Sequence, residues 1–245
     1  KTVKYPTDQS LLMDSRATSR SLLDIYSHLL AVYGPQNWWP AEEPFEVMVG
    51  AILTQSTAWR NVEKAIANLK IEAQGRASLS EPGATVTLSA AALRHLSLSE
   101  VAALIYPSGY YNAKARKLKA LAHWLGANYT DNLVKLFAQN IHELRRQLLS
   151  VYGIGLETAD TIILYAAGQP IFVIDAYTRR ITDRLGLVPK VQSYTAYQTL
   201  FMSNLPAEPK LFNEYHALLV QLGKDVCRKQ PFCTRCCLGH LCYYN

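Results

Sequence analysis

Three kinds of residue in this sequence could do chemistry: a solitary carboxylate, a pair of glycines and a cluster of thiols. The carboxylate is Asp175, which follows the apolar residues 171–174 and precedes a helix expected from residue 176. In that position it could stabilise a positively charged transition state and orient or deprotonate a water molecule. It could also cap the helix that follows, and one side chain can do both.

The two glycines are Gly153 and Gly155, which stand between two segments with helical spacing of apolar residues, 142–151 and 158–167. Glycine permits a positive φ and a close approach of the backbone, and the second helix then begins with amide N–H groups that lack helical partners. Such a helix start suits a phosphate, so the hairpin could grip a nucleic-acid backbone. An ordinary helical hairpin that binds nothing carries the same pattern.

All five cysteines lie within residues 227–242. Disulfides are the wrong interpretation, because the rest of the sequence offers no partner cysteines and no secretory segment is visible. Zinc usually takes two CxxC pairs, and only Cys233 and Cys236 form one, so the spacing favours an iron–sulfur cluster over zinc. Cys237 is then the spare thiol, and the expected ligands are Cys227, Cys233, Cys236 and Cys242.

The motifs occur in an order that resembles the helix-hairpin-helix (HhH-GPD) DNA glycosylase superfamily, which includes endonuclease III. The matching segments are FEVMVGAILTQST, SGYYNAKARKLKAL, YGIGLETAD, VIDAYTRRITDRLG and the cysteine loop. The resemblance implies an all-α fold with two lobes and a DNA cleft between them. Residues 36–168 would form a six-helix lobe that contains the hairpin, and residues 1–35 and 169–245 a discontinuous lobe that holds a [4Fe-4S] cluster.

Glu157 is the departure that changes the expected chemistry. In endonuclease III the position two residues after the second hairpin glycine is a lysine that forms a Schiff base with the sugar. A carboxylate cannot form that imine. We therefore expect a monofunctional glycosylase without AP-lyase activity. Asp175 would carry out the hydrolysis of the N-glycosidic bond. Glu157 could also simply complement the positive end of a helix.

Two tryptophans indicate which kind of damaged base the protein would act on. The segments NWWP and GAILTQSTAW resemble the 3-methyladenine DNA glycosylase III branch, which also carries glutamate at the Glu157 position. In that branch, aromatics matching Trp38 and Trp59 sandwich the flipped base. An alkylated purine is a cation, and indole faces attract cations. Packing in the core is the other common fate of tryptophan.

The remaining DNA contacts are expected from the superfamily pattern and from charge. Gln55 would fill the gap left by the flipped nucleotide, unless it is an ordinary solvent-exposed helix end. The chain carries 25 basic and 19 acidic residues, a net charge of +6, so the positive charge must be localised to bind DNA. The candidates are the basic run at residues 114–119, the pairs Arg145–Arg146 and Arg179–Arg180, and the group Lys224, Arg228 and Arg235 around the cysteines.

Helical periodicity dominates the chain. The expected helices span residues 19–33, 45–53, 60–69, 113–125, 141–149, 158–167, 176–185, 196–205 and 211–222, and residues 71–95, rich in Ser, Ala and Gly, are expected to form a surface excursion. The longest apolar stretch is interrupted at residues 168–170, so we expect no membrane span.

We expect a monomer that binds double-stranded DNA containing a damaged base, in the cytoplasm near the bacterial nucleoid, or in the nucleus or an organelle of a eukaryote. A glycosylase for oxidised or deaminated pyrimidines and a non-catalytic damage-binding module remain the alternative functions.

Overall fold

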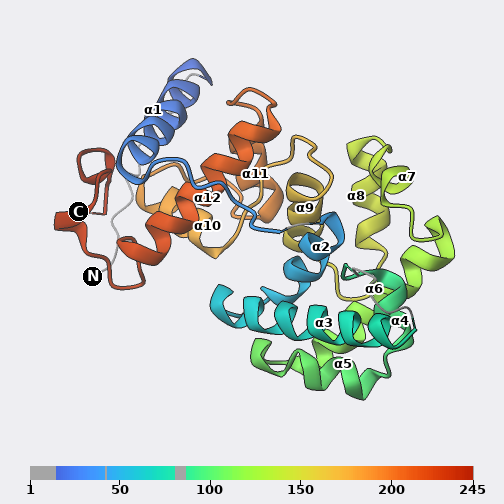
Figure 1. Ribbon diagram of the computed structural model, residues 1–245. Helices are drawn as coiled ribbons and strands as arrows, with labels where there is room; N and C mark the ends of the chain where they lie inside the picture. The colour runs from blue at the N-terminus through green and yellow to red at the C-terminus, as the bar shows by residue number, and fades with distance from the viewer. Residues whose placement is uncertain (1–14, 42, 81–86, 245) are drawn as a thin grey trace. The chain divides into compact units, whose positions relative to one another are not determined.

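The computed structural model describes residues 15–41, 43–80 and 87–244, and every regular element in these residues is a helix (Figure 1). The predicted all-α fold is confirmed. The chain divides into two compact units, each described here by itself. The continuous unit is Trp39–Gln169, and the discontinuous unit combines the chain up to Trp38 with Pro170–Asn245.

The continuous unit is built on helices that bury apolar residues at helical spacing. Helix α2 is buried from Phe45 to Leu53, and α6 buries Leu118, Leu121 and Leu125 completely. Both helices contact each other, and α2 also packs on α9, which in turn packs on α8. Its elements are α2 (Pro44–Leu53), α3 (Trp59–Ser80), α4 (Ala90–His95), α5 (Leu98–Leu104), η1 (Tyr106–Ser108), α6 (Tyr111–Tyr129), α7 (Leu133–Phe137), α8 (Ile141–Leu149) and α9 (Leu156–Tyr165).

The expected surface excursion at residues 71–95 is helical in most of its described part. Helix α3 continues through the first ten of these residues, and α4 occupies the last six. The continuation is stabilised because Ala73 is buried and Arg76 pairs with both Glu72 and Glu100. Helix α4 begins where Ser89 accepts the amide of Ala92. Residues 81–86 of the excursion lie outside the described residues.

The discontinuous unit has an aromatic core. The ring of Phe172 stacks on Phe201 with centroids 4.1 Å apart and meets the edges of Phe212 and Tyr215. Helix α12 packs against both α1 and α10. The elements of this unit are α1 (Ser15–Tyr33), α10 (Ala176–Arg184), α11 (Tyr194–Met202), α12 (Pro209–Asp225), η2 (Cys233–Arg235) and η3 (Gly239–Leu241).

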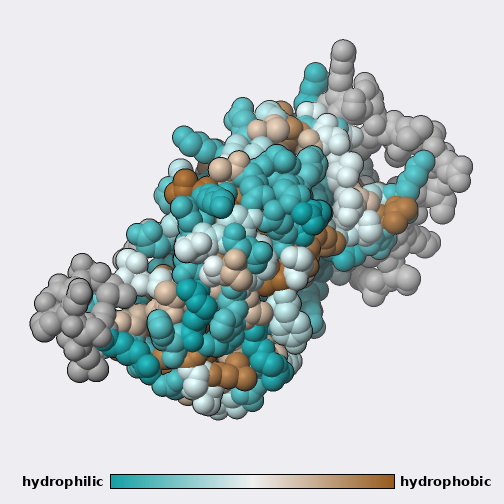
Figure 2. All heavy atoms as spheres, turned by 90° about the vertical axis from the view of Figure 1, so that its right-hand side faces the viewer, coloured by the Kyte–Doolittle hydropathy of each residue, from teal (hydrophilic) through white to brown (hydrophobic). Residues whose placement is uncertain are grey.

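Among the described residues, none of the helices is both long and apolar enough to span a lipid bilayer. On the face of the molecule in Figure 2, hydrophobic residues form small separate patches among hydrophilic ones. Scattered patches of this kind are ordinary on a water-exposed surface. The large apolar side chains instead fill the helix contacts that position the functional residues.

Candidate functional site

Asp175 is held in one orientation by the start of α10. Residues 171–174 form a buried extended segment that leads into it, each at most 3% exposed. Asp175 has φ −94° and ψ −178°, and its Oδ1 accepts the amide of Thr178 at 2.7 Å. The predicted helix cap is therefore confirmed. The cap uses one carboxylate oxygen and leaves Oδ2 for other contacts.

His216 faces that second oxygen, and no motif or spacing in the sequence predicts this contact. Its Nε2 lies 3.8 Å from Oδ2 of Asp175, and the two side chains are 9% and 15% exposed. Burial lowers the pKa of His216, the nearby Asp175 opposes that shift, and Lys224 adds to it. Because burial is the largest of these effects, the ring is neutral near pH 7.

The packing of α12 on α10 explains why His216 meets Asp175. His216 and Gly223 are seven residues apart and so share one face of α12. A Cβ atom at Gly223 would lie 2.4 Å from the ring of Tyr177 in α10, so only glycine permits this approach. The face of α12 that carries His216 is thereby directed at α10.

The three predicted basic residues near the cysteines lie at the surface of the discontinuous unit. Lys224 places its Nζ 5.6 Å from the centre of the Trp38 ring, and Trp38 is half-buried. The guanidinium of Arg228 lies over the ring of Phe232, and Arg228 and Arg235 are both exposed. All three positive charges are thus displayed by the unit that carries Asp175.

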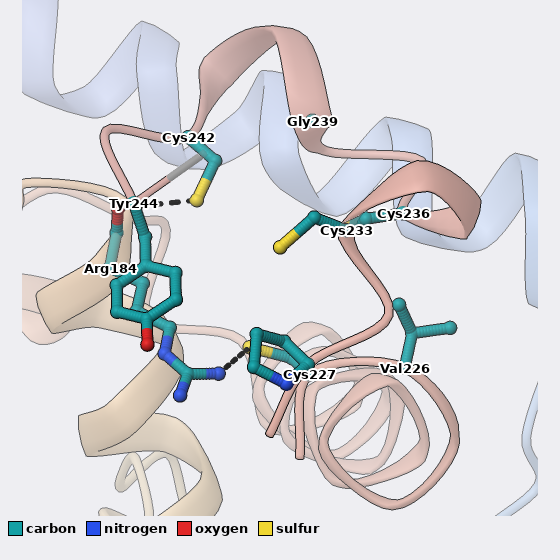
Figure 3. Close-up of a pocket in the computed structure, with 9 residues that line it drawn as sticks. Arg184, Val226, Cys227, Cys233, Cys236, Gly239, Cys242 and Tyr244 are labelled. Atoms are coloured by element: carbon teal, nitrogen blue, oxygen red, sulfur yellow. Dashed lines mark hydrogen bonds between the residues drawn. The ribbon is translucent and has the colours of Figure 1, made fainter. Parts of the chain in front are cut away.

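Four cysteines surround one pocket. Figure 3 shows the sulfur atoms of Cys227, Cys233 and Cys242 directed into the space between them, and Cys236 also lines it. Cys237 is not among the lining residues. The four that line the pocket are the four predicted from the spacing. In the described residues, no group of three or more His, Cys, Asp or Glu side chains is arranged to hold a single metal ion.

Arg184 fastens the cysteine loop to α10. Its guanidinium lies 3.2 Å from Sγ of Cys227 and donates to the carbonyl of Arg228 at 2.7 Å. It also stacks on the ring of Tyr244, while its own carbonyl accepts from the amide of Tyr243. The helix that begins at Asp175 therefore ends in contact with the loop.

The hairpin of the continuous unit has the predicted glycine geometry. Gly153 has φ +85°, and a Cβ there would lie 2.2 Å from Cγ of Lys117, so both conformation and space require glycine. Gly155 is extended, caps α9 with no side-chain bond, and has nothing within 4 Å of a Cβ position. The first amides of α9 are therefore not covered by a cap side chain. Glu157 is exposed in this first turn.

Gln55 is fixed to the hairpin. Its amide nitrogen donates to the carbonyl of Gly153 at 3.1 Å and to the hydroxyl of Thr158 at 3.0 Å, and its Oε1 accepts from Lys117. The turn between α2 and α3 and the turn between α8 and α9 thus form one hydrogen-bonded surface. Ser56, the next residue, has φ +54°.

Two lysines of the basic run at residues 114–119 are used inside the continuous unit, whereas Arg116 of the run is exposed. Lys114 is 2% exposed and donates to the carbonyls of Leu53 and Ser108 and to the hydroxyl of Thr57. Burial and the charge of Lys117 lower the pKa of Lys114 to about 8. Lys119 similarly donates to three carbonyls at the end of α4. These lysines close helix ends, which their sequence spacing could not reveal.

The predicted tryptophans lie in different units. Trp59 meets the edge of Trp39, with centroids 5.0 Å apart, and Trp39 also contacts Tyr165. A Cβ at Gly50 would lie 2.7 Å from the ring of Trp39. Sequence reasoning missed Trp39 and Tyr165 as members of this aromatic cluster. Trp38 belongs instead to the discontinuous unit.

Comparisons with known proteins all point to one class of DNA repair proteins. A family model described as "HhH-GPD superfamily base excision DNA repair protein" matches residues 49–207. "Putative DNA repair glycosylase MJ1434" of Methanocaldococcus jannaschii is 41% identical over 220 residues, which cover 89% of this chain and 94% of that protein. The crystal structure of H. pylori 3-methyladenine DNA glycosylase bound to 1,N6-ethenoadenine is 25% identical with a TM-score of 0.67, covering 86% of this chain and 98% of that one. A trapped endonuclease III–DNA covalent intermediate is 20% identical with a TM-score of 0.75, covering 92% and 96%.

Proposed function

Because the chain belongs to the HhH-GPD superfamily of base excision DNA repair proteins, and is a DNA glycosylase of that superfamily, we propose that it is monofunctional. It flips a damaged base out of duplex DNA, hydrolyses the N-glycosidic bond and leaves the strand intact. Two separate observations carry this proposal: the discontinuous unit holds a fixed carboxylate at Asp175, and the hairpin helix of the continuous unit has a glutamate at Glu157.

Asp175 is the proposed catalytic residue. As the base leaves, positive charge develops on the sugar, and a carboxylate held in place stabilises that charge without having to reorganise. The amide of Thr178 fixes Oδ1 at 2.7 Å, so Oδ2 is the oxygen that can face the sugar and accept a proton from the attacking water.

Glu157 is the reason to propose hydrolysis alone. Strand cleavage through a Schiff base needs an amine at the sugar, and a carboxylate has none. The first turn of α9 instead carries negative charge, which complements the helix dipole. We therefore propose that Glu157 forms no covalent intermediate with DNA like the one trapped for endonuclease III.

Alkylated purines of the 3-methyladenine type are the proposed substrates. The likeness to the H. pylori 3-methyladenine glycosylase supports this, as does the position of Lys224, whose Nζ lies 5.6 Å from the centre of the Trp38 ring, because indole faces attract cations. In the continuous unit, Trp59 offers an aromatic surface of its own, with Trp39 and Tyr165 beside it.

DNA binding is proposed for two surfaces. In the continuous unit, Gly153 and Gly155 would approach a phosphate at the start of α9, and Gln55 would fill the gap left by the flipped base, offsetting part of the few kcal/mol that flipping costs. In the discontinuous unit, the exposed charges of Lys224, Arg228 and Arg235 would contact the DNA backbone.

A [4Fe-4S] cluster is the proposed cofactor. Such a cluster requires four cysteine thiolates, and four cysteines line one pocket; Arg184 donates to the sulfur of Cys227, as partners of metal ligands usually do. Cys227, Cys233, Cys236 and Cys242 would hold it. When bound, it would cross-link the loop that displays Arg228 and Arg235.

The test is incubation of the purified protein with duplexes that each contain one modified base, followed by alkali to reveal abasic sites. The panel contains 3-methyladenine, 7-methylguanine, thymine glycol, uracil and hypoxanthine. We expect release of 3-methyladenine and 7-methylguanine. Selective release of thymine glycol or uracil would instead identify a pyrimidine glycosylase, and binding with no release from any duplex would identify a damage-binding module.

A further inference from the structure

His216 is buried beside Asp175 and has no part in the proposed reaction so far. It reaches the carboxylate from a different helix, with Nε2 at 3.8 Å from Oδ2. That distance is too long for a hydrogen bond but within the range of an ion pair when the ring is protonated. The contact therefore depends on the charge of the imidazole.

We propose that His216 is a positioning residue for Asp175: its neutral ring leaves the charge of Oδ2 available for the reaction, and its protonated ring pairs with Oδ2 and offsets that charge. The inference rests on the proposed catalytic role of Asp175. Oδ1 is already occupied by the amide of Thr178, so His216 acts on the only oxygen that the helix cap leaves over.

The surroundings favour the neutral ring. His216 is 7% exposed, and an isolated charge in such a place is costly because it loses its hydration. Asp175 favours protonation, Lys224 on the same helix disfavours it, and burial is the largest effect, so the pKa of the ring falls below its ordinary value of 6.5. Helix α1 also packs on α12, and there Tyr33 contacts Asp225, the residue after Lys224.

The geometry also holds the two helices together. Oδ1 of Asp175 accepts the amide of Thr178 at the start of α10, and α12 packs closely on α10 at Gly223, on the face that also carries His216. The helix contact therefore keeps the backbones of the two residues close to each other.

The first experiment needs no substrate and follows the ring nitrogens of His216 by NMR during a pH titration of the whole protein. We expect the pKa of His216 to lie below 6.5 in the wild type, to fall further in Asp175→Asn, and to rise in Lys224→Gln. The signals of the other five histidines serve as internal controls: His28, His95, His123, His142 and His240. A His216 titration that is unchanged in Asp175→Asn overturns the inference.

The second experiment measures single-turnover base release against pH with enzyme in excess. Below the His216 titration the wild-type rate should fall about tenfold per pH unit, whereas His216→Gln should keep its plateau rate to lower pH. Lys224→Gln should move the acid limb to higher pH, and the double variant should behave like His216→Gln. An acid limb unmoved by His216→Gln contradicts the proposal, and His216→Asn repeats the test should the glutamine variant fold poorly.

The two experiments fail in different ways. NMR shifts without base release from any duplex would keep the pairing of His216 with Asp175 but overturn the proposed function. Base release with no coupling in the titration would keep the function and overturn the role of His216.

Discussion

At the scale of single residues, the two oxygens of one carboxylate have different contacts in the site. The amide of Thr178 takes Oδ1 of Asp175, and His216 stands 3.8 Å from Oδ2. An amide in place of the carboxylate could keep the cap, because its carbonyl oxygen still accepts, but it would lack the negative charge. Capping and catalysis can therefore be separated by one substitution.

Asp175→Asn should reduce single-turnover base release by at least about a thousandfold, since both charge stabilisation and proton acceptance are lost. Binding to the damaged duplex should stay within a few fold of the wild type, because no DNA-contacting residue changes. Gel-shift titration and the release assay measure the two quantities. Equal turnover by the variant would remove Asp175 from the mechanism.

At the scale of elements, the turn that carries Gln55 is supported by a buried ammonium group. Lys114 of α6 satisfies the carbonyl of Leu53 at the end of α2 and that of Ser108 at the end of η1. Helix ends leave such carbonyls unpaired, and burying them without a donor is unfavourable. The lysine thus replaces the solvent that these helix ends cannot reach.

Lys114→Met should lower the free energy of unfolding by roughly 2 kcal/mol at pH 7, because the unpaired acceptors outweigh relief from burying a charge. The difference in stability between wild type and variant should widen as the pH rises from about 8, the pKa of this lysine in the folded protein, to 10.5, its ordinary pKa. Between these two pH values the unfolded wild type holds a proton that the folded wild type has released, so the stability of the wild type rises with pH. The methionine variant has no such proton, so its stability does not rise for this reason.

Urea unfolding across this pH range measures the effect, with Lys64→Met, at an exposed position of α3, as the matched control. The control should resemble the wild type. A difference between wild type and Lys114→Met that stays constant with pH would contradict the lowered pKa.

The sequence predicts those features that depend on neighbouring residues, and it does not predict contacts between residues far apart in the chain. The helices at residues 141–149 and 176–184 and the cap at Asp175 follow from neighbouring residues, and they were predicted to within one residue. The lysine contacts of α6, the partnership of Trp39 with Trp59, and the approach of His216 to Asp175 join residues far apart in the chain. No spacing rule contains them, so only the fold reveals them.

At the scale of the whole molecule, each unit carries one part of the chemistry. The continuous unit has the hairpin and Gln55, and the discontinuous unit has Asp175 with the cysteine loop fastened to the end of the same helix by Arg184. Loss of the loop should therefore affect the helix that begins at Asp175, the proposed catalytic carboxylate, in addition to removing surface charge.

Cys233→Ser should abolish bound iron and the associated visible absorbance, and it should lower both stability and DNA affinity. Cys237→Ser is the matched control, because this neighbouring thiol does not line the pocket, and it should retain iron. Iron content per chain and thermal unfolding measure the comparison. Equal iron in the two variants would contradict the assigned ligands.

The most direct test of base removal without strand cleavage uses the duplex that is processed best, in parallel reactions with alkali, without alkali and with borohydride. We predict broken strands only after alkali and no covalent protein–DNA adduct, because Glu157 supplies no amine. Strand breaks without alkali together with a borohydride-trapped adduct would contradict the account, and loss of that adduct in Lys117→Met would identify the amine beside Gly153 as its source.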